Sequence, residues 1–228
     1  MLEDANLDEN YSGEVNSSER DETKAWGTSF EVGGVTYAAS LFWQPLQNRD
    51  DPFVEIIEAS ENVLEGADLF CMKPGKSPQF GLCVSYQGYK KKMAAAAVSV
   101  STALADRSSF LAVFKVSNGW WYVCARNDII LSDGDMLFLN EEDAKEQFMS
   151  MLAVPDWGRK IAPEEWGLDD IENISLESLL DKGATAKLQK IRALRGPKLF
   201  AVVAAIGVAA IWLVSTLINS VFLAPPKK

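Results

Sequence analysis

Residues 119–140, GWWYVCARNDIILSDGDMLFLN, decide how the rest of the chain is interpreted. Asp128, Asp133 and Asp135 fall within eight positions here, a density that would suit a magnesium site or a catalytic carboxylate pair. The competing interpretation is structural, because Asp133-Gly134 is a strong two-residue hairpin signal and Asn127-Asp128 can form a second turn. A magnesium site also needs a phosphate substrate, which nothing else in the sequence indicates. We therefore assign Asp133, Gly134 and Asp135 to turn structure and predict no metal site.

The residues around this stretch predict a mixed domain. Strands are expected for SFLAVFKVS, GWWYVCAR, IILS and DMLFL, after which Asn140 caps a helix with three acids in its first turn. Upstream, TSFEV and VTYAASLFW flank Gly33-Gly34 as a hairpin, and Asp51-Pro52 opens a helix. DLFCMK and FGLCVSY read as strands, and KKKMAAAAVSVSTALADR as a central packing helix. The fold class is α/β, with strands and helices mixed (α+β).

Composition excludes several classes of enzyme. The chain of 228 residues has no histidine, which removes a Ser/His/Asp triad, a Cys/His pair and a His-ligated metal. The three cysteines form no CxxC and sit in apolar stretches, so we expect reduced, buried thiols. The net charge of −10 disfavours a nucleic-acid partner.

The segment KPGKSP (73–78) invites comparison with a phosphate-binding loop, because Gly75-Lys76-Ser77 matches the end of that motif. The match fails at its start, where Phe70 stands in place of glycine, and Pro78 follows where a helix should begin. An ordinary turn between two strands is the preferred interpretation, so we predict no cofactor.

The chain divides into five parts by composition. Residues 1–23 form an acidic tail predicted to be disordered, 24–181 a cytoplasmic α/β domain, and 182–198 a basic amphipathic juxtamembrane segment. Residues 199–224 contain no charge over 26 positions, enough for a transmembrane helix, and 225–228 begin a periplasmic region.

The bases before the helix predict a cytoplasmic N-terminus and contact with the membrane surface; they are Lys187, Lys190, Arg192, Arg195 and Lys198. Within the predicted helix, Ala201, Ala205 and Ala209 have the small-xxx-small spacing of helix packing and suggest a homo-oligomer, although alanine is common in any such helix.

The residues from Trp121 to Trp166 resemble a known family. WYVCARNDIILSDGDMLFLNEEDA, followed by PDWGRKIAPEEWGL, resembles the pilin accessory protein (PilO) family of type IVb pilus systems. The residues that carry the resemblance are Trp121, Tyr122, Arg126, Trp157, Pro163 and Trp166. It implies a single-pass protein of the bacterial inner membrane whose cytoplasmic domain is a degenerate actin-like fold.

The resemblance implies a function in pilus assembly rather than catalysis. We expect a non-enzymatic scaffold that links the pilus assembly ATPase and a polytopic inner-membrane platform protein to periplasmic parts. Two alternatives stay open: a membrane-anchored, actin-like nucleotide-binding protein, and a membrane-anchored signalling regulator.

Overall fold

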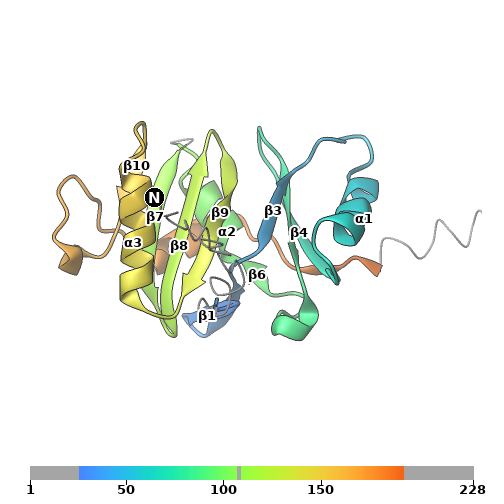
Figure 1. Cartoon of the computed structure of the whole chain (residues 1–228), viewed down its shortest axis with the longest axis horizontal. Coiled ribbons are helices and arrows are strands. Elements are labelled where there is room, and N and C mark those ends of the chain that lie inside the picture. The colour runs from blue at the N-terminus through green and yellow to red at the C-terminus, as the bar shows by residue number, and fades with distance from the viewer. Residues whose placement is uncertain (1–25, 107–108, 193–228) are drawn as a thin grey trace, which may run out of the picture.

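Two four-stranded sheets, each covered by its own helix, make up most of the domain (Figure 1). The structure, a computed structural model, describes residues 26–106 and 109–192. The α1 sheet has the order β11 (Gln189–Lys190), β4 (Leu69–Lys73), β5 (Gln79–Cys83), β3 (Phe42–Pro45), and is covered by α1 (Pro52–Asn62). The α3 sheet has the order β10 (Arg159–Ile161), β7 (Phe110–Val116), β8 (Gly119–Arg126), β9 (Ile129–Phe138), and is covered by α3 (Glu141–Leu152).

Smaller elements fill the space between the two sheets. A third sheet has the order β1 (Ser29–Val32), β2 (Val35–Ala38), β6 (Ala94–Ala95), and leads directly into α2 (Ala96–Ala103). Helix α4 (Leu176–Lys182) packs on α2. Two 3-10 turns, Ser85–Gln87 and Glu164–Trp166, complete the described elements.

The core is continuous from one large sheet to the other. The largest buried cluster contains Trp43 and Cys71 of the α1 sheet together with Trp121 and Val123 of the α3 sheet. Separate clusters lie beneath each outer helix, around Ile56 of α1 and around Phe148 of α3. Because the central cluster is shared, each sheet buries one of its faces against the other sheet and not only against its own helix.

Several predicted elements are confirmed. Gly33 and Gly34 both have positive φ and join β1 to β2, as the hairpin prediction requires. Pro52 begins α1, although the Asp51 side chain makes no capping hydrogen bond. Asn140 caps α3 by accepting a 2.8 Å hydrogen bond from the backbone N–H of Asp143. The mixed α/β class is therefore confirmed.

The predicted hairpin at Asp133-Gly134 is wrong. Both residues, and Asp135 after them, lie inside the continuous strand β9. The strand accommodates them by a bulge: Ala125 pairs with Ile130 and Val123 with Asp135, so two steps along β8 face five along β9. Gly134 is required there for space, since a Cβ at this position would lie 2.7 Å from the carbonyl oxygen of Cys124. The β8–β9 turn is instead made by Asn127 and Asp128, at φ 52° and 65°, which confirms the second predicted turn.

Two further elements differ from their predictions. The central helix is shorter than expected, because residues 90–93 form a turn and 94–95 a strand before α2 begins. The basic segment forms a strand at its centre, where Gln189–Lys190 make up β11, paired antiparallel with β4, while Lys182 ends α4 and Arg192 is helical. Leu188 and Ile191 are buried, and the bases beside them are exposed. Strand pairing therefore takes the place of a helix at Gln189 and Lys190 in the predicted amphipathic segment.

The predicted membrane segment, 199–224, lies outside the described residues, together with Arg195, Lys198, Ala201, Ala205 and Ala209 and the acidic tail 1–23. Within 26–106 and 109–192, no helix is long and apolar enough to cross a bilayer.

Candidate functional site

Three polar bridges cross the boundary between the α1 sheet and the α3 sheet. We call them the polar seam and define it by Lys73, Gln79, Asp128 and Asp135 with their partners. In each bridge, the hydrogen bonds that cross from one sheet to the other join groups more than 50 residues apart in sequence, so only the folded chain brings them together. Two of the three predicted aspartates belong to it.

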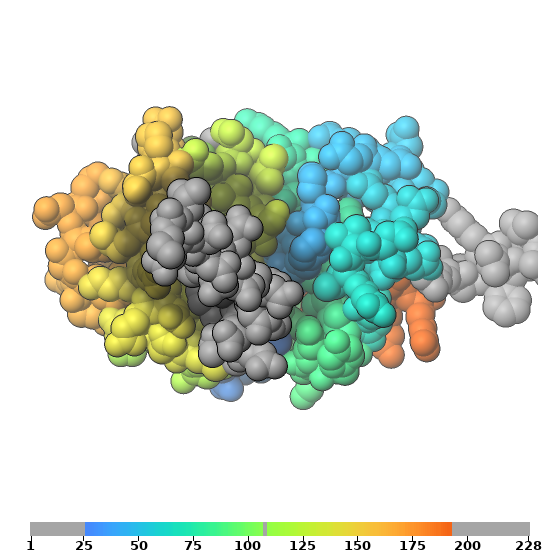
Figure 2. All heavy atoms as spheres, in the orientation of Figure 1, coloured from blue at the N-terminus to red at the C-terminus, as the bar shows by residue number. Residues whose placement is uncertain are grey.

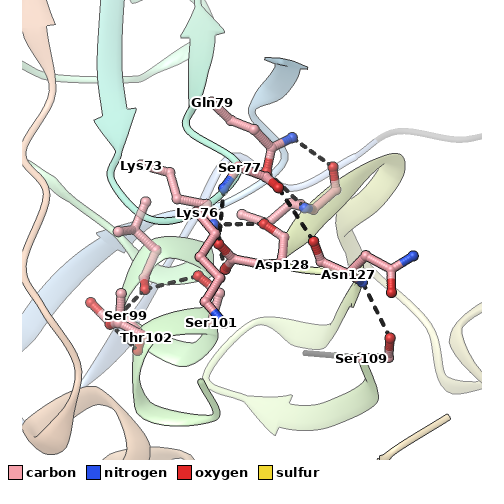
Figure 3. Close-up of polar contacts among 12 residues, drawn as sticks. Lys73, Lys76, Ser77, Gln79, Ser99, Ser101, Thr102, Ser109, Asn127 and Asp128 are labelled. Carbon is pink, nitrogen blue, oxygen red and sulfur yellow. Dashed lines mark hydrogen bonds and ion pairs between the residues drawn. The ribbon is translucent and has the colours of Figure 1, made fainter. Parts of the chain in front are cut away.

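The first bridge is an ion pair between the end of β4 and the β8–β9 turn (Figure 3). The Lys73 side chain is only 1% exposed, and its Nζ lies 2.8 Å from Oδ1 of Asp128 and 2.8 Å from the carbonyl oxygen of Asp128. Oδ2 of Asp128 accepts a longer hydrogen bond from the backbone N–H of Ser77. A buried ammonium is costly unless it is paired, so Asp128 is what makes Lys73 tolerable inside the domain.

The second bridge is formed by a buried glutamine, Gln79, whose side-chain amide makes two hydrogen bonds to the backbone of one residue in β9 (Figure 3). Nε2 of Gln79 donates to the carbonyl oxygen of Ile130 at 2.9 Å, and Oε1 accepts from the N–H of Ile130 at 2.8 Å. Both polar atoms of the side chain are therefore satisfied by the backbone of β9, at the place where the bulge begins.

The third bridge is centred on Asp135, which is 4% exposed. Oδ1 accepts from the N–H of Ser40 and from Nε1 of Trp121, each at 2.9 Å. Oδ2 accepts from the N–H of Leu41 at 3.2 Å and from Nε1 of Trp43 at 2.9 Å. Burial raises the pKa of Asp135, while the hydrogen bonds from Trp121, Trp43, Ser40 and Leu41 oppose that rise.

Asp133 differs from its two neighbours. It is exposed, and among the described residues no hydrogen bond or ion pair joins its side chain to the seam, whereas Asp128 and Asp135 are bound by separate elements. Within the described residues, no group of three or more acidic or cysteine side chains is arranged to hold a metal ion.

Two cavities flank the seam. The larger, of about 610 Å³, is lined by residues of both sheets, including Phe42, Leu82, Asp133 and Asp135. Its size falls within the range of ligand sites, but its two carboxylates disfavour a phosphate-bearing ligand.

The smaller cavity, of about 220 Å³, lies beside KPGKSP and includes Lys76, Ser101 and Thr102. The Thr102 hydroxyl already donates to the carbonyl oxygen of Val98 and accepts from the N–H of Ala184. KPGKSP itself forms the connection between β4 and β5, which confirms the predicted turn. This cavity is smaller than the range expected for a ligand site.

The six residues that carry the family resemblance lie mainly in and around the layer beneath α3. Trp121 points instead to the seam. The guanidinium of Arg126 lies 4.3 Å from the ring centre of Trp157 and donates to the carbonyl oxygen of Pro155. Nε1 of Trp166 donates to Glu141 at 2.7 Å. Tyr122 is fully buried, and Pro163 precedes the turn that holds Trp166. These contacts fix α3 and the chain after it onto the sheet.

The cysteines are free and buried, as predicted. Burial raises the pKa of Cys71 and Cys83 well above the ordinary range, and that of Cys124 to about 12. The thiolate form, which is the reactive one, is therefore suppressed in the folded domain.

Lys73 and Gln79 are the seam residues that sequence reasoning missed. Each lies at an end of a strand, where a polar residue usually faces solvent, and their partners come from the β8–β9 region, 51 to 55 positions away. The only local signal is that the paired strand segments 69–73 and 79–83 are otherwise apolar, apart from these two residues.

The fold and the seam together define a mixed α/β domain of two helix-covered sheets, joined by buried polar bridges. Residues 37–221 match the model of the pilin accessory protein (PilO) family, and because the match spans most of the chain, the chain belongs to that family. Its role therefore lies in pilus biogenesis, among protein partners of that machinery.

A solved structure supports the same fold. The crystal structure of the cytoplasmic domain of BfpC superimposes with a TM-score of 0.57 at 21% identity, covering 72% of this chain and 97% of that one. No curated protein sequence matches.

Proposed function

We propose that the chain is a non-enzymatic component of a type IVb pilus assembly machine in the bacterial inner membrane. Its folded domain would dock the pilus assembly ATPase and the polytopic platform protein on the cytoplasmic side, and residues 199–224 would link that domain to periplasmic parts. The observation that carries this proposal is the family match, because residues 37–221 include most of the folded domain and most of the apolar segment 199–224.

The fold is proposed to be a degenerate actin-like domain. In the α3 sheet, the antiparallel strands β7, β8 and β9 are followed by α3 and then by β10, which pairs in parallel with β7. This order agrees with one half of an actin-like fold and supports the resemblance to that group.

The state of the seam favours a scaffold over a nucleotide-binding protein. The ammonium of Lys73 is paired with Asp128, and both oxygens of Asp135 accept hydrogen bonds from the chain itself. Groups satisfied in this way stabilise the domain and are not free to coordinate a ligand without breaking internal contacts.

The test is a pull-down of the full chain in detergent, with mass spectrometry of the retained proteins. Recovery of the pilus ATPase and the platform protein supports the proposal, whereas retention of a cytoplasmic regulatory factor alone favours the signalling alternative. ATP binding is measured on the same preparation by calorimetry. Micromolar binding of ATP would contradict a scaffold without nucleotide.

The proposed orientation is tested separately with single cysteines introduced at positions 20 and 226. The native thiols are buried, so an impermeant maleimide applied to intact cells reports on the introduced thiols. Labelling at 226 but not at 20 is expected. Labelling at both positions would contradict a cytoplasmic N-terminus.

A further inference from the structure

The fold gathers two basic segments that are far apart in the sequence. The backbone N–H of Lys92 donates to the carbonyl oxygen of Leu188, and the N–H of Leu188 donates to that of Met93, both at 2.9 Å. The run Lys90-Lys91-Lys92 therefore lies against the strand that carries the bases before residue 193. We call the combined surface the basic patch and define it by Lys90, Lys91, Lys92, Lys187, Lys190 and Arg192.

The basic patch is exposed, and its bases form no ion pair with the described residues. All six side chains belong to exposed residues, and within 26–106 and 109–192 none of them forms an ion pair. The carboxylate of Asp68, whose carbonyl oxygen accepts from the N–H of Ile191, is turned toward Ser85 and accepts two hydrogen bonds there. A patch of one sign is notable in a chain whose net charge is −10.

The backbone fixes the patch rather than leaving it on a loose loop. Residues 90–93 form a turn closed by a 3.2 Å hydrogen bond from the N–H of Met93 to the carbonyl oxygen of Lys90. Lys92 adopts φ 75°, an uncommon conformation for a lysine, and its neighbours hold it there. Leu188 and Ile191 are 1% and 3% exposed, so the strand between them is anchored in the core.

The position of the patch in the chain indicates its partner. β11 lies at the edge of the α1 sheet, and in Figure 2 the C-terminal end of the coloured chain lies at the outer surface of the α1 side. Only six residues separate Arg192 from the uncharged stretch 199–224. If that stretch crosses a bilayer, the patch must lie close to the headgroups, because six residues span at most about 20 Å.

We propose that the basic patch binds anionic lipid headgroups and holds the α1 side of the domain against the membrane. The proposal rests on the membrane anchoring put forward above and adds to it Lys90, Lys91 and Lys92, which the linear sequence does not place near the anchor. A cluster of exposed bases close to a membrane-crossing segment is attracted to anionic lipid. The competing occupant is the acidic tail 1–23, and the test separates the two.

The experiment uses the full chain in nanodiscs made of phosphatidylcholine alone or with phosphatidylglycerol. Lysine acylation rates are read for each site by mass spectrometry. Lys90, Lys91, Lys187 and Lys190 should react about fivefold more slowly in the anionic discs, and high salt should remove the difference. Lys115, exposed on β7 of the other sheet, should react equally in both.

Variants make the test specific. Lys90→Gln/Lys91→Gln should reduce the protection of Lys187 and Lys190, while the matched pair Lys76→Gln/Lys115→Gln should leave it unchanged. Lys76 follows the end of β4 that is opposite to the β11 contact. Lys92 is kept because its positive φ would confound a substitution.

The possible results distinguish lipid binding by the patch, membrane anchoring of the chain and occupation of the patch by the acidic tail. Equal acylation in both kinds of disc, with the chain still co-eluting with the discs, overturns the patch but not the anchoring. A chain that does not co-elute contradicts the anchoring itself. The lysines of the patch could also react slowly in both kinds of disc and react faster once residues 1–23 are deleted. That result would assign the patch to the acidic tail and overturn the lipid proposal.

Discussion

At the scale of single residues, the buried ion pair gives an asymmetric prediction. Asp128→Asn keeps a side chain that tolerates the left-handed turn but leaves the buried ammonium of Lys73 without its counter-charge. We expect a loss of about 3 kcal/mol in the free energy of unfolding, measured by urea denaturation. Lys73→Met should cost less, because Asp128 is 25% exposed and water can solvate it.

The double variant Lys73→Met/Asp128→Asn provides the control for that prediction. Removing both charges eliminates the unpaired ammonium, so its stability should exceed that of Asp128→Asn alone. Strict additivity of the two single changes would show that the pair does not couple the sheets through charge.

The two aspartates next to Gly134 should differ strongly in how much their substitution lowers the free energy of unfolding. In Asp135→Asn, an amide nitrogen replaces one oxygen and faces two N–H donors that have lost their acceptor, so about 3 kcal/mol should be lost. Asp133→Asn changes an exposed residue and should stay within about 0.5 kcal/mol of the unmodified chain. Melting followed by tryptophan fluorescence compares the two, and equal losses would rule out the seam as the reason that Asp135 matters.

At the scale of secondary-structure elements, the N-cap of α3 can be tested by itself. Asn140→Ala removes the acceptor for the N–H of Asp143 and should cost about 1 kcal/mol of unfolding free energy. The matched change in the same helix is Ser150→Ala, an exposed hydroxyl that bonds only within its own turn, and it should have almost no effect. A silent Asn140→Ala would mean that tertiary packing alone begins the helix there.

Elements with strong local signals were predictable from the sequence. The Gly33-Gly34 hairpin, the start of α1 at Pro52 and the cap at Asn140 each depend on residues within a few positions of one another. Asp133-Gly134 carries an equally strong local signal, yet the chain there continues as β9. The reason is non-local. Asp135 accepts hydrogen bonds from β3, from β8 and from the loop just before β3, and the strand bulges where it meets these donors.

The same distinction explains the segment before residue 193. The spacing of Leu188 and Ile191 is compatible with a helix, but it also places both side chains in the core when β11 pairs with β4. A local pattern cannot choose between these arrangements, because the choice depends on a free strand edge more than a hundred residues away. The polar seam was beyond sequence reasoning for the same reason.

At the scale of the whole molecule, the shared core predicts that the two sheets unfold together. The cysteines are natural probes, since Cys71 and Cys83 lie in the α1 sheet and Cys124 lies in the α3 sheet. At pH 8 the buried thiols, with their raised pKa values, should resist an alkylating reagent until the domain opens.

Alkylation of the three thiols should therefore report one opening free energy, measured for each peptide by mass spectrometry in mild urea. Trp43, Cys71, Trp121 and Val123 belong to one buried cluster, so opening either sheet exposes the core of the other. Asp128→Asn should then accelerate alkylation at all three sites by the same factor, about a hundredfold for the loss argued above. If Cys71 and Cys83 reacted at least about tenfold faster than Cys124, the α1 side would open on its own, and the central cluster would not make the two sheets one cooperative unit.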